Sequence, residues 1–468
     1  MFKAIFTNSF GILFSRILGF LRDMLMASVL GANIYSDIFF VAFKLPNLFR
    51  RIFAEGAFSQ TFIPAFTRSH HKGVFSVAIF TSLLSVILVL SLLVTLFPYY
   101  ATKLIAIGFD ENTIIQAAPF VAINFWYLGF IFVVTFIAAL LQYKHHFATT
   151  AFATALLNIA LIGALLLADS ADKKEVVLYL SYGVLVGGAL QLFVHLIALK
   201  KLGLFPLLAG GVKYFSKKKT LIEKEVQKFK KEFLPAIWGN SSAQFSAFLD
   251  TWLASLLVSG SISYLYYANR VFQLPLALFA IATSVAIFPK VSRYLKNNDT
   301  TKALEYMQKA FWFLSFILAF FTAGGVVLSD EVVKLLFFRG AFSLTDVQHT
   351  ASVLEMYMVG LVFFGLAKLF LLWIYAQQNQ KEAAKIATYT LGANIILSLL
   401  FLEPLGAMGL ALASSLSGVV QFIWAVKIFG KERFMAFLAS KNSIILVIAL
   451  VVFVIILEKI KVFLDVLI

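Results

Sequence analysis

The sequence predicts an all-α protein that crosses a membrane many times and is built from two similar halves. Three observations support this fold class. The 468 residues are 61% hydrophobic and 13% charged, apolar runs of spanning length recur along the chain, and the halves share short motifs in the same order. A soluble globular domain is only about half apolar and about a quarter charged, so the composition excludes one.

Thirteen apolar windows are long enough to cross about 30 Å of hydrocarbon as helices. They lie near 8–30, 34–66, 74–98, 117–142, 147–168, 176–199, 232–259, 262–290, 305–328, 347–376, 384–402, 405–428 and 442–458. The second window is too long for a straight crossing and contains Pro46, so we expect a kink there. The tail from Glu458 to Ile468 is too short for another crossing, and we expect it to lie along the interface.

The net charge of +16 could indicate a nucleic-acid partner, but lysines and arginines concentrate in alternate connecting loops. The intervening loops are poor in basic residues or carry acids, as at Asp110 and Glu111. Under the positive-inside rule the basic loops and the N-terminus lie in the cytoplasm. The charge is therefore interpreted as membrane topology, and no nucleic acid is expected as a partner.

The windows divide into an N-terminal lobe of six spans at 1–199, a basic cytoplasmic linker at 200–231, a C-terminal lobe of six spans at 232–428, and an additional span and tail at 442–468. The linker is either an amphipathic helix on the cytoplasmic leaflet or a solvated connector. The lobes look like copies, with Asp23–Leu30 matching Asp250–Leu257, Phe43–Pro46 matching Phe272–Pro275, and Pro64–Arg68 matching Pro289–Arg293. Because matched elements start from the same side, the repeats are parallel and are expected to enclose a central cavity, as in an alternating-access carrier.

Charged side chains inside the spans are candidate transport residues, because a charge at mid-bilayer costs about 2.5–3.5 kcal/mol on insertion scales. Helical periodicity places those of the first span on one face. The candidate substrate-binding residues are Arg16, Arg22, Asp23, Asp37, Arg50, Arg51 and Arg270, and the candidate gating or packing residues are Ser15, Gly19, Pro46, Glu55 and Gly56.

Any single pair, such as Arg22 with Asp23, could instead be an internal ion pair between packed helices. Such pairs do not account for the whole set, because arginine outnumbers acid in these spans and an unmatched guanidinium needs an anion or water. The planar fork of arginine suits phosphate. The chain has no cysteine and no nucleotide-binding loop, zinc-protease or serine-hydrolase motif, so we expect a carrier rather than an enzyme.

Two continuous stretches, Ser15–Asp23 and Asp37–Gln60, strongly resemble the MurJ (MviN) family of bacterial lipid II flippases. Further support comes from Tyr267–Arg270, Phe337–Phe342 and Gly406–Ser415. The resemblance implies the multidrug/oligosaccharidyl-lipid/polysaccharide (MOP) exporter fold, with two lobes around a V-shaped cationic cavity. It also implies that undecaprenyl-pyrophosphate-linked peptidoglycan precursor, lipid II, is flipped from the cytoplasmic to the periplasmic leaflet of the inner membrane, powered by the membrane potential or an ion gradient. The functional positions of the family map onto Arg16, Arg22, Asp23, Asp37, Arg50 and Arg270.

Some members of that family hold a sodium ion, and the matching positions here would be Asp250, Asn394, Ser398 and Ser414. The alternative is polar residues bonding between packed helices. No other cofactor is expected. Two departures stand out: the family generally has fourteen spans, the last two supplying a lipid-tail groove, and Tyr375–Gln380 replaces its usual Asp-Thr sequence.

Three other functions compete with this hypothesis. The first is a MOP-fold exporter of another lipid-linked oligosaccharide or of drugs; the arginine excess disfavours cationic drugs. The second is a membrane glycosyltransferase, for which the outer loops look too small, and the third is a structural scaffold. We expect a monomer whose partners are lipid II and membrane lipids.

Overall fold

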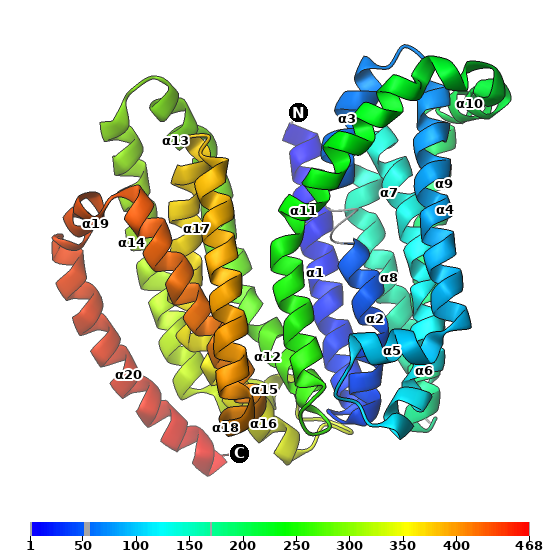
Figure 1. Cartoon of the computed structure of the whole chain (residues 1–468). Coiled ribbons are helices and arrows are strands. Elements are labelled where there is room, and N and C mark those ends of the chain that lie inside the picture. The colour runs from blue at the N-terminus through cyan, green and yellow to red at the C-terminus, as the bar shows by residue number, and fades with distance from the viewer. Residues whose placement is uncertain (1, 51–56, 169–170, 468) are drawn as a thin grey trace. The chain divides into compact units, whose positions relative to one another are not determined.

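The computed structural model describes residues 2–50, 57–168 and 171–467, and over these ranges the chain is helical with no strand. The predicted all-α class is confirmed. Contacts divide the chain into two units, Met1–Leu256 and Leu257–Ile468 (Figure 1). The predicted boundary between linker and second lobe, at 231/232, falls inside one continuous helix that is grouped by its contacts with the first unit.

The described residues of the first unit form eleven α-helices and one short 3-10 helix. They are α1 (Phe2–Leu30), α2 (Ile34–Phe49), α3 (Phe58–Arg68), α4 (Lys72–Leu96), α5 (Pro98–Ile105), α6 (Glu111–Phe125), α7 (Tyr127–Tyr143), α8 (Ala148–Leu167), α9 (Lys173–Lys201), α10 (Phe205–Lys218), η2 (Lys219–Ile222) and α11 (Glu223–Ala254).

The second unit contains nine α-helices and one π-helical segment. They are α12 (Ser261–Pro275), η3 (Leu276–Ile281), α13 (Ala282–Lys296), α14 (Thr300–Val327), α15 (Ser329–Phe337), α16 (Leu344–Val359), α17 (Leu361–Ala376), α18 (Gln380–Phe429), α19 (Lys431–Leu438) and α20 (Lys441–Leu467).

Several predicted spans are interrupted. The described parts of the window at 34–66 are α2, which contains Pro46 and ends at Phe49, and α3, with residues 51–56 outside the described ranges. In the second unit the matching window changes to π-helix directly after Pro275, as expected where a proline removes a backbone donor and crowds the preceding turn. Two further spans are broken at corresponding places, at Trp126 between α6 and α7 and at Gly360 between α16 and α17.

The fifty residues of α18 do not form one straight rod. Gly406 has φ 55° and ψ −130°, which is not helical. The rings of Tyr389 and Trp424 stack with centroids 4.9 Å apart, although 35 residues of helix would separate them by about 50 Å. The chain therefore doubles back near Gly406 and forms the two antiparallel spans that the sequence predicts at 384–402 and 405–428.

Nine helical segments among the described residues are long and apolar enough to cross a membrane. The folded α18 combines two of the thirteen predicted windows in one segment, and the windows at 8–30, 34–66 and 232–259 are not among the nine. The multi-pass membrane architecture is nevertheless confirmed.

The tail was expected to leave the last span and lie along the interface. Instead α20 continues without a break from Lys441 to Leu467, and Lys461 donates to the backbone carbonyl of Val327 at 3.1 Å. That bond ties the end of α20 to α14. The separate interfacial tail is therefore replaced by a longer final helix.

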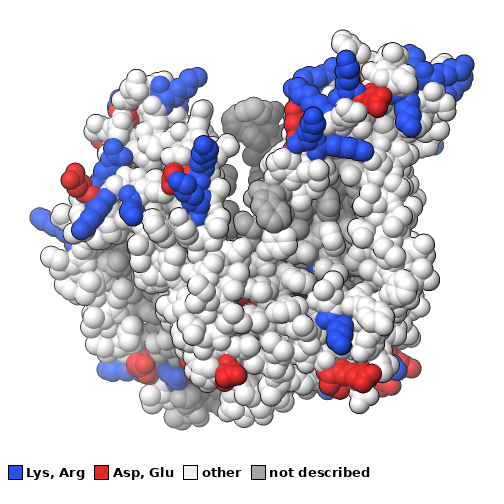
Figure 2. All heavy atoms as spheres, in the orientation of Figure 1, with Lys and Arg blue, Asp and Glu red and all other residues white. Residues whose placement is uncertain are grey.

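Basic side chains mark one end of each unit. Figure 2 shows most visible lysines and arginines at the end that carries α10 in the first unit and at the end that carries α19 in the second, while acidic side chains gather near α6 at the opposite end of the first unit. A cluster of buried aromatic rings, including Phe58, Phe62 and Phe229, joins α3, α7 and α11 beneath the basic end of the first unit. The ends of the helices are thus chemically distinct, as a membrane protein requires.

Candidate functional site

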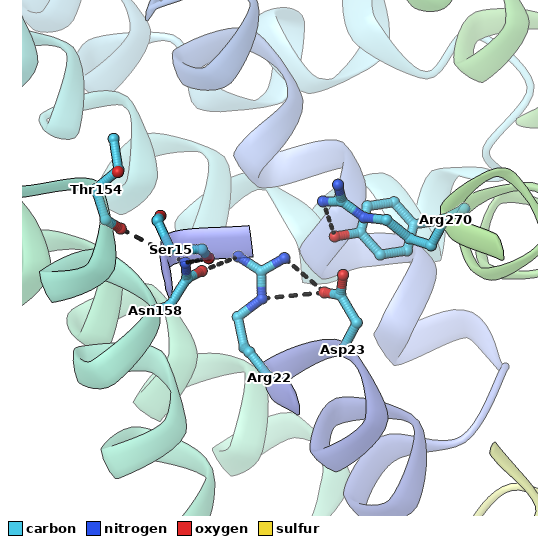
Figure 3. A network of polar contacts seen from close by, with 7 residues as sticks. Ser15, Arg22, Asp23, Thr154, Asn158 and Arg270 are labelled. Carbon is cyan, nitrogen blue, oxygen red and sulfur yellow. Dashed lines mark hydrogen bonds and ion pairs between the residues drawn. The ribbon is translucent and has the colours of Figure 1, made fainter. Parts of the chain in front are cut away.

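Arg22 and Asp23 form a buried ion pair on α1 of the first unit. Arg22 is 7% exposed and Asp23 1%. The Nε and Nη2 atoms of Arg22 donate to Oδ1 of Asp23 at 3.0 and 2.5 Å (Figure 3). The two charges neutralise each other, which is what makes their burial tolerable.

Asn158 on α8 completes this network. Nη1 of Arg22 donates to its Oδ1 at 3.0 Å, and its Nδ2 donates to the carbonyl of Ser15 at 3.0 Å (Figure 3). Gly19 lies between these contacts, where a Cβ would sit 3.5 Å from the Asn158 amide. Ser15, Gly19 and Arg22 therefore face α8, which assigns Gly19 to packing.

Arg16 does not join this interface. The sequence placed it on the same stripe as Arg22, but its side chain is exposed and makes no ion pair with any residue that the structure describes. A helical stripe spans a wide arc, and α8 contacts the part of it that contains Ser15, Gly19 and Arg22. Arg16 is thus a cation open to a ligand, whereas Arg22 is already bonded through all three of its nitrogen atoms.

Two predicted residues lie on α2, and a third, Arg50, follows its last residue. Asp37 is 2% exposed and stands in the first turn, which a capping box between Asn33 and Ser36 fixes. Pro46 is buried. At the other end the half-buried Arg50 donates through Nε and Nη2 to Oδ1 of Asn47 at 3.2 and 3.1 Å. Arg51, Glu55 and Gly56 lie outside the described residues.

In the second unit Arg270 is held by an aromatic neighbour one turn away on α12. Its Nη2 donates to the Tyr266 hydroxyl at 2.7 Å, and the guanidinium carbon lies 4.8 Å from the centroid of that ring (Figure 3). The face of an aromatic ring attracts a cation electrostatically, so Tyr266 holds this guanidinium through its ring as well as through its hydroxyl. The side chain is half-buried.

The predicted sodium ligands of α18 lie across its hairpin. Nδ2 of Asn394 donates to Oγ of Ser414 at 3.3 Å. Ser398 is fully buried and its hydroxyl has no hydrogen-bond partner among the described residues. These three side chains could offer oxygen atoms to a hard cation. The fourth predicted ligand, Asp250, is half-buried on α11 and is grouped with the other unit.

The sequence reasoning missed two polar residues. Asn158 was overlooked, although an asparagine in the apolar window at 147–168 was a visible signal. Lys368 was overlooked as well. It lies within α17 about 12 Å from the end at Ala376, and it forms no hydrogen bond or ion pair with any described residue. Its side chain leans toward the start of the helix, away from that end.

A family model for the lipid II flippase MurJ matches residues 26–466 of this chain. The chain belongs to the MurJ family. A probable lipid II flippase MurJ of Helicobacter pylori strain J99 is 50% identical over 426 residues, which cover 89% of this chain and 93% of that protein. The probable lipid II flippase MurJ of Haemophilus influenzae is 33% identical over 430 residues, which cover 87% of this chain and 82% of that protein. Members of this family are transporters rather than enzymes.

Solved structures agree with this assignment. A lipid II flippase MurJ in an inward closed conformation superimposes with a TM-score of 0.79 at 26% identity, covering 98% of this chain and 99% of that one. An inward-facing multidrug resistance MATE transporter of the MOP superfamily gives 0.68 at 14% identity, covering 91% and 96%. The second likeness concerns the fold alone, and it confirms the predicted MOP exporter architecture.

Proposed function

We propose that this chain transports lipid II, an undecaprenyl-pyrophosphate-linked peptidoglycan precursor, from the cytoplasmic to the periplasmic leaflet of the bacterial inner membrane. Family membership over residues 26–466 carries this proposal. The mechanism is alternating access, in which two repeat-related lobes expose one site to each side in turn. In this proposal the chain works as a monomer with its N-terminus and basic loops in the cytoplasm.

The pyrophosphate would be bound first by Arg16, which is exposed and makes no ion pair with a described residue. Arg50 and Arg270 are further candidate ligands, in addition to their hydrogen bonds with Asn47 and Tyr266. A planar guanidinium can bind a phosphate through two parallel hydrogen bonds. Arg22 and Asp23 would instead fix α1 against α8, with Asp37 and Arg51 contributing from the second span. Lys368 is a further candidate cation.

The direction of transport follows from charge. Moving a phosphate-bearing group outward across an inside-negative membrane releases about 2.3 kcal/mol per charge for each 100 mV. The potential can therefore drive export without nucleotide hydrolysis. Return of the empty site, which is rich in arginine, would be assisted by the same field only if its net charge changed.

Sodium is the proposed source of that change. Its ligands would be Asn394, Ser398 and Ser414 on α18, with Asp250 supplying the negative charge. The unsatisfied buried hydroxyl of Ser398 supports this, because a buried polar group without a partner carries a desolvation cost that an ion would offset. If sodium were bound in only one of the two steps, the net charge of the site would differ by one between the outward step and the return step.

Complementation tests the proposal most directly. The chain would be expressed in a bacterium depleted of its own flippase, and lipid II on the outer leaflet would be measured together with growth. We expect both to be restored. If protein folded in the membrane restores neither, and instead exports another lipid-linked oligosaccharide or a drug, the assignment of lipid II as cargo is wrong.

A further inference from the structure

A pocket of about 420 Å³ lies where α10 meets the start of α4, among residues that the transport mechanism above does not use. Its lining includes His70, His71, Lys72 and Lys218, together with Tyr214, and contains no acidic side chain. The volume falls within the roughly 300–1,000 Å³ of small-molecule sites. A cavity lined by basic groups and no acid selects an anion.

Two glycines build the wall of this pocket by letting α4 and α10 approach closely. A Cβ added to Gly73 would lie 2.4 Å from the carbonyl oxygen of Leu207, and one added to Gly211 would lie 2.3 Å from the carbonyl oxygen of Gly73. Any larger residue at either place would push the helices apart. The linker region is therefore packed against α4 rather than free in solvent.

The lysine on α10 is held in place but not neutralised. Lys218 is half-buried, its Nζ lies 5.8 Å from the ring centroid of Tyr214, and it makes no ion pair with a described carboxylate. On the α4 side, Nζ of Lys72 donates to the carbonyl of Ser69 at 3.1 Å, which leaves its charge uncompensated. Two fixed ammonium groups thus face one space.

The corresponding helix of the second unit shows what the first one lacks. There α14 begins with Asp299, whose Oδ1 accepts the backbone N–H of Lys302 at 3.1 Å and whose other oxygen lies 3.2 Å from Nζ of Lys302. At α4 the same cap position is His71, which makes no capping hydrogen bond with its side chain. The second copy carries its own anion, whereas the first leaves this place to an external one.

The surroundings indicate that the anion comes with a lipid. On α10, Phe205 and Val212 lie on another face from the pocket and are 56% and 65% exposed. A helix with basic residues on one face and exposed apolar residues on another is typical of the bilayer surface. We propose that this pocket binds the phosphate of an anionic phospholipid, with its acyl chains in the adjacent leaflet. The assignment of that leaflet as cytoplasmic rests on the proposed orientation.

The test measures lipid retained by the purified full-length protein, using native mass spectrometry with phosphatidylglycerol and phosphatidylethanolamine of identical acyl chains. We expect one phosphatidylglycerol bound in preference to phosphatidylethanolamine, and about fivefold weaker binding in Lys218→Gln. Lys217→Gln and Lys219→Gln are matched controls, since they remove the same charge beside the pocket. Equal retention of both lipids, or equal loss in the controls, would overturn the proposal.

A second variant separates the pocket from general surface charge. A Cβ at Gly210 meets no atom within 4 Å, so Gly210→Leu can fill the cavity while every basic group stays and the helix gains propensity. We expect it to weaken phosphatidylglycerol binding as much as Lys218→Gln does, with Gly210→Ala close to wild type. Displacement of the lipid by millimolar inorganic phosphate or glycerol phosphate would show a site for a soluble phosphate and would contradict the lipid assignment.

Discussion

Two matched asparagines show how differently the two halves of this molecule treat polar groups inside a span. Leu157–Leu161 on α8 aligns with Ala393–Leu397 on α18, so Asn158 corresponds to Asn394. Asn158 accepts a hydrogen bond from a guanidinium and donates to a backbone carbonyl. Asn394 donates a hydrogen bond to a serine hydroxyl at 3.3 Å. The matched asparagines therefore bond to different groups, a guanidinium in one half and a hydroxyl in the other.

The two halves also differ in sequence at the residue directly before a matched aspartate. Asp23 aligns with Asp250, but Leu249 stands where the first half has Arg22. The first half thus carries a cation as its own side chain beside the acid, whereas the second has none at that place. In the proposal above, a sodium ion would bring to Asp250 a positive charge like the one that Arg22 brings to Asp23.

Breaking the ion pair of α1 should have the largest effect. Asp23→Asn leaves the buried Arg22 without its counter-charge, and we expect a loss of about 3–5 kcal/mol in the free energy of unfolding. The double variant Arg22→Leu with Asp23→Leu should recover most of that loss, because neither charge then remains buried. Denaturant unfolding of the purified protein in detergent measures both. Equal destabilisation in the double variant would contradict a neutralised pair.

Arg16 tests the contrast between a paired and an exposed arginine. Arg16→Ala should lower outward transport of lipid II by about 10- to 100-fold, the equivalent of one charged hydrogen bond at about 1.5–3 kcal/mol. Its unfolding free energy should stay within about 0.5 kcal/mol of wild type, because the side chain is exposed. Lipid II exposure and denaturant unfolding are measured side by side. A stable variant with normal transport would remove Arg16 from the mechanism.

Replacing each matched asparagine by alanine compares how much the two contribute to the free energy of unfolding. Asn158→Ala should cost about 1–3 kcal/mol, since it leaves part of the Arg22 guanidinium without an acceptor. Asn394→Ala removes the hydrogen bond to Ser414, which joins two neutral groups, and this loss should cost less, about 0.5–1.5 kcal/mol. Thermal unfolding of both variants under one condition gives the order. The reverse order would mean that Asn394 supports a larger network than Asn158 does.

Leu249→Arg would give the second half the tethered cation that it lacks. We expect wild-type transport to fall about tenfold when sodium is replaced by a large organic cation, and the variant to be insensitive to that replacement. Leu249→Gln is the matched control, with a polar side chain and no charge. Wild-type transport that is indifferent to sodium would rule out the proposed ion.

The smallest effect concerns the helix caps. The pKa of Asp299 is lowered, first by the hydrogen bond from the backbone N–H of Lys302. Its folded pKa therefore lies below the ordinary value of 3.8, so its stabilising contribution is present above that value and is lost as the pH falls through the folded pKa. Asp299→Asn should flatten this part of the acid unfolding curve. A curve identical to wild type would show that the cap does not contribute.

Much of the fold could be predicted from sequence because membrane helices obey strong local rules. Span length, basic loops and paired motifs such as Asp23 and Asp250 each need only neighbouring residues or a simple alignment. The turn within α18 was likewise expected from two adjacent apolar windows. The end of α20 was predicted wrongly, because window length cannot show that Lys461 bonds to α14.

The sequence by itself determined which residues are charged inside the spans, and helical periodicity put Arg16, Arg22 and Asp23 within one broad stripe. Only the tertiary structure decided their separate environments. Asn158 reaches Arg22 from 136 positions away, and α8 covers one part of the stripe and not the other. Periodicity fixes the direction of a side chain around its own helix, but whether it is neutralised depends on what packs there.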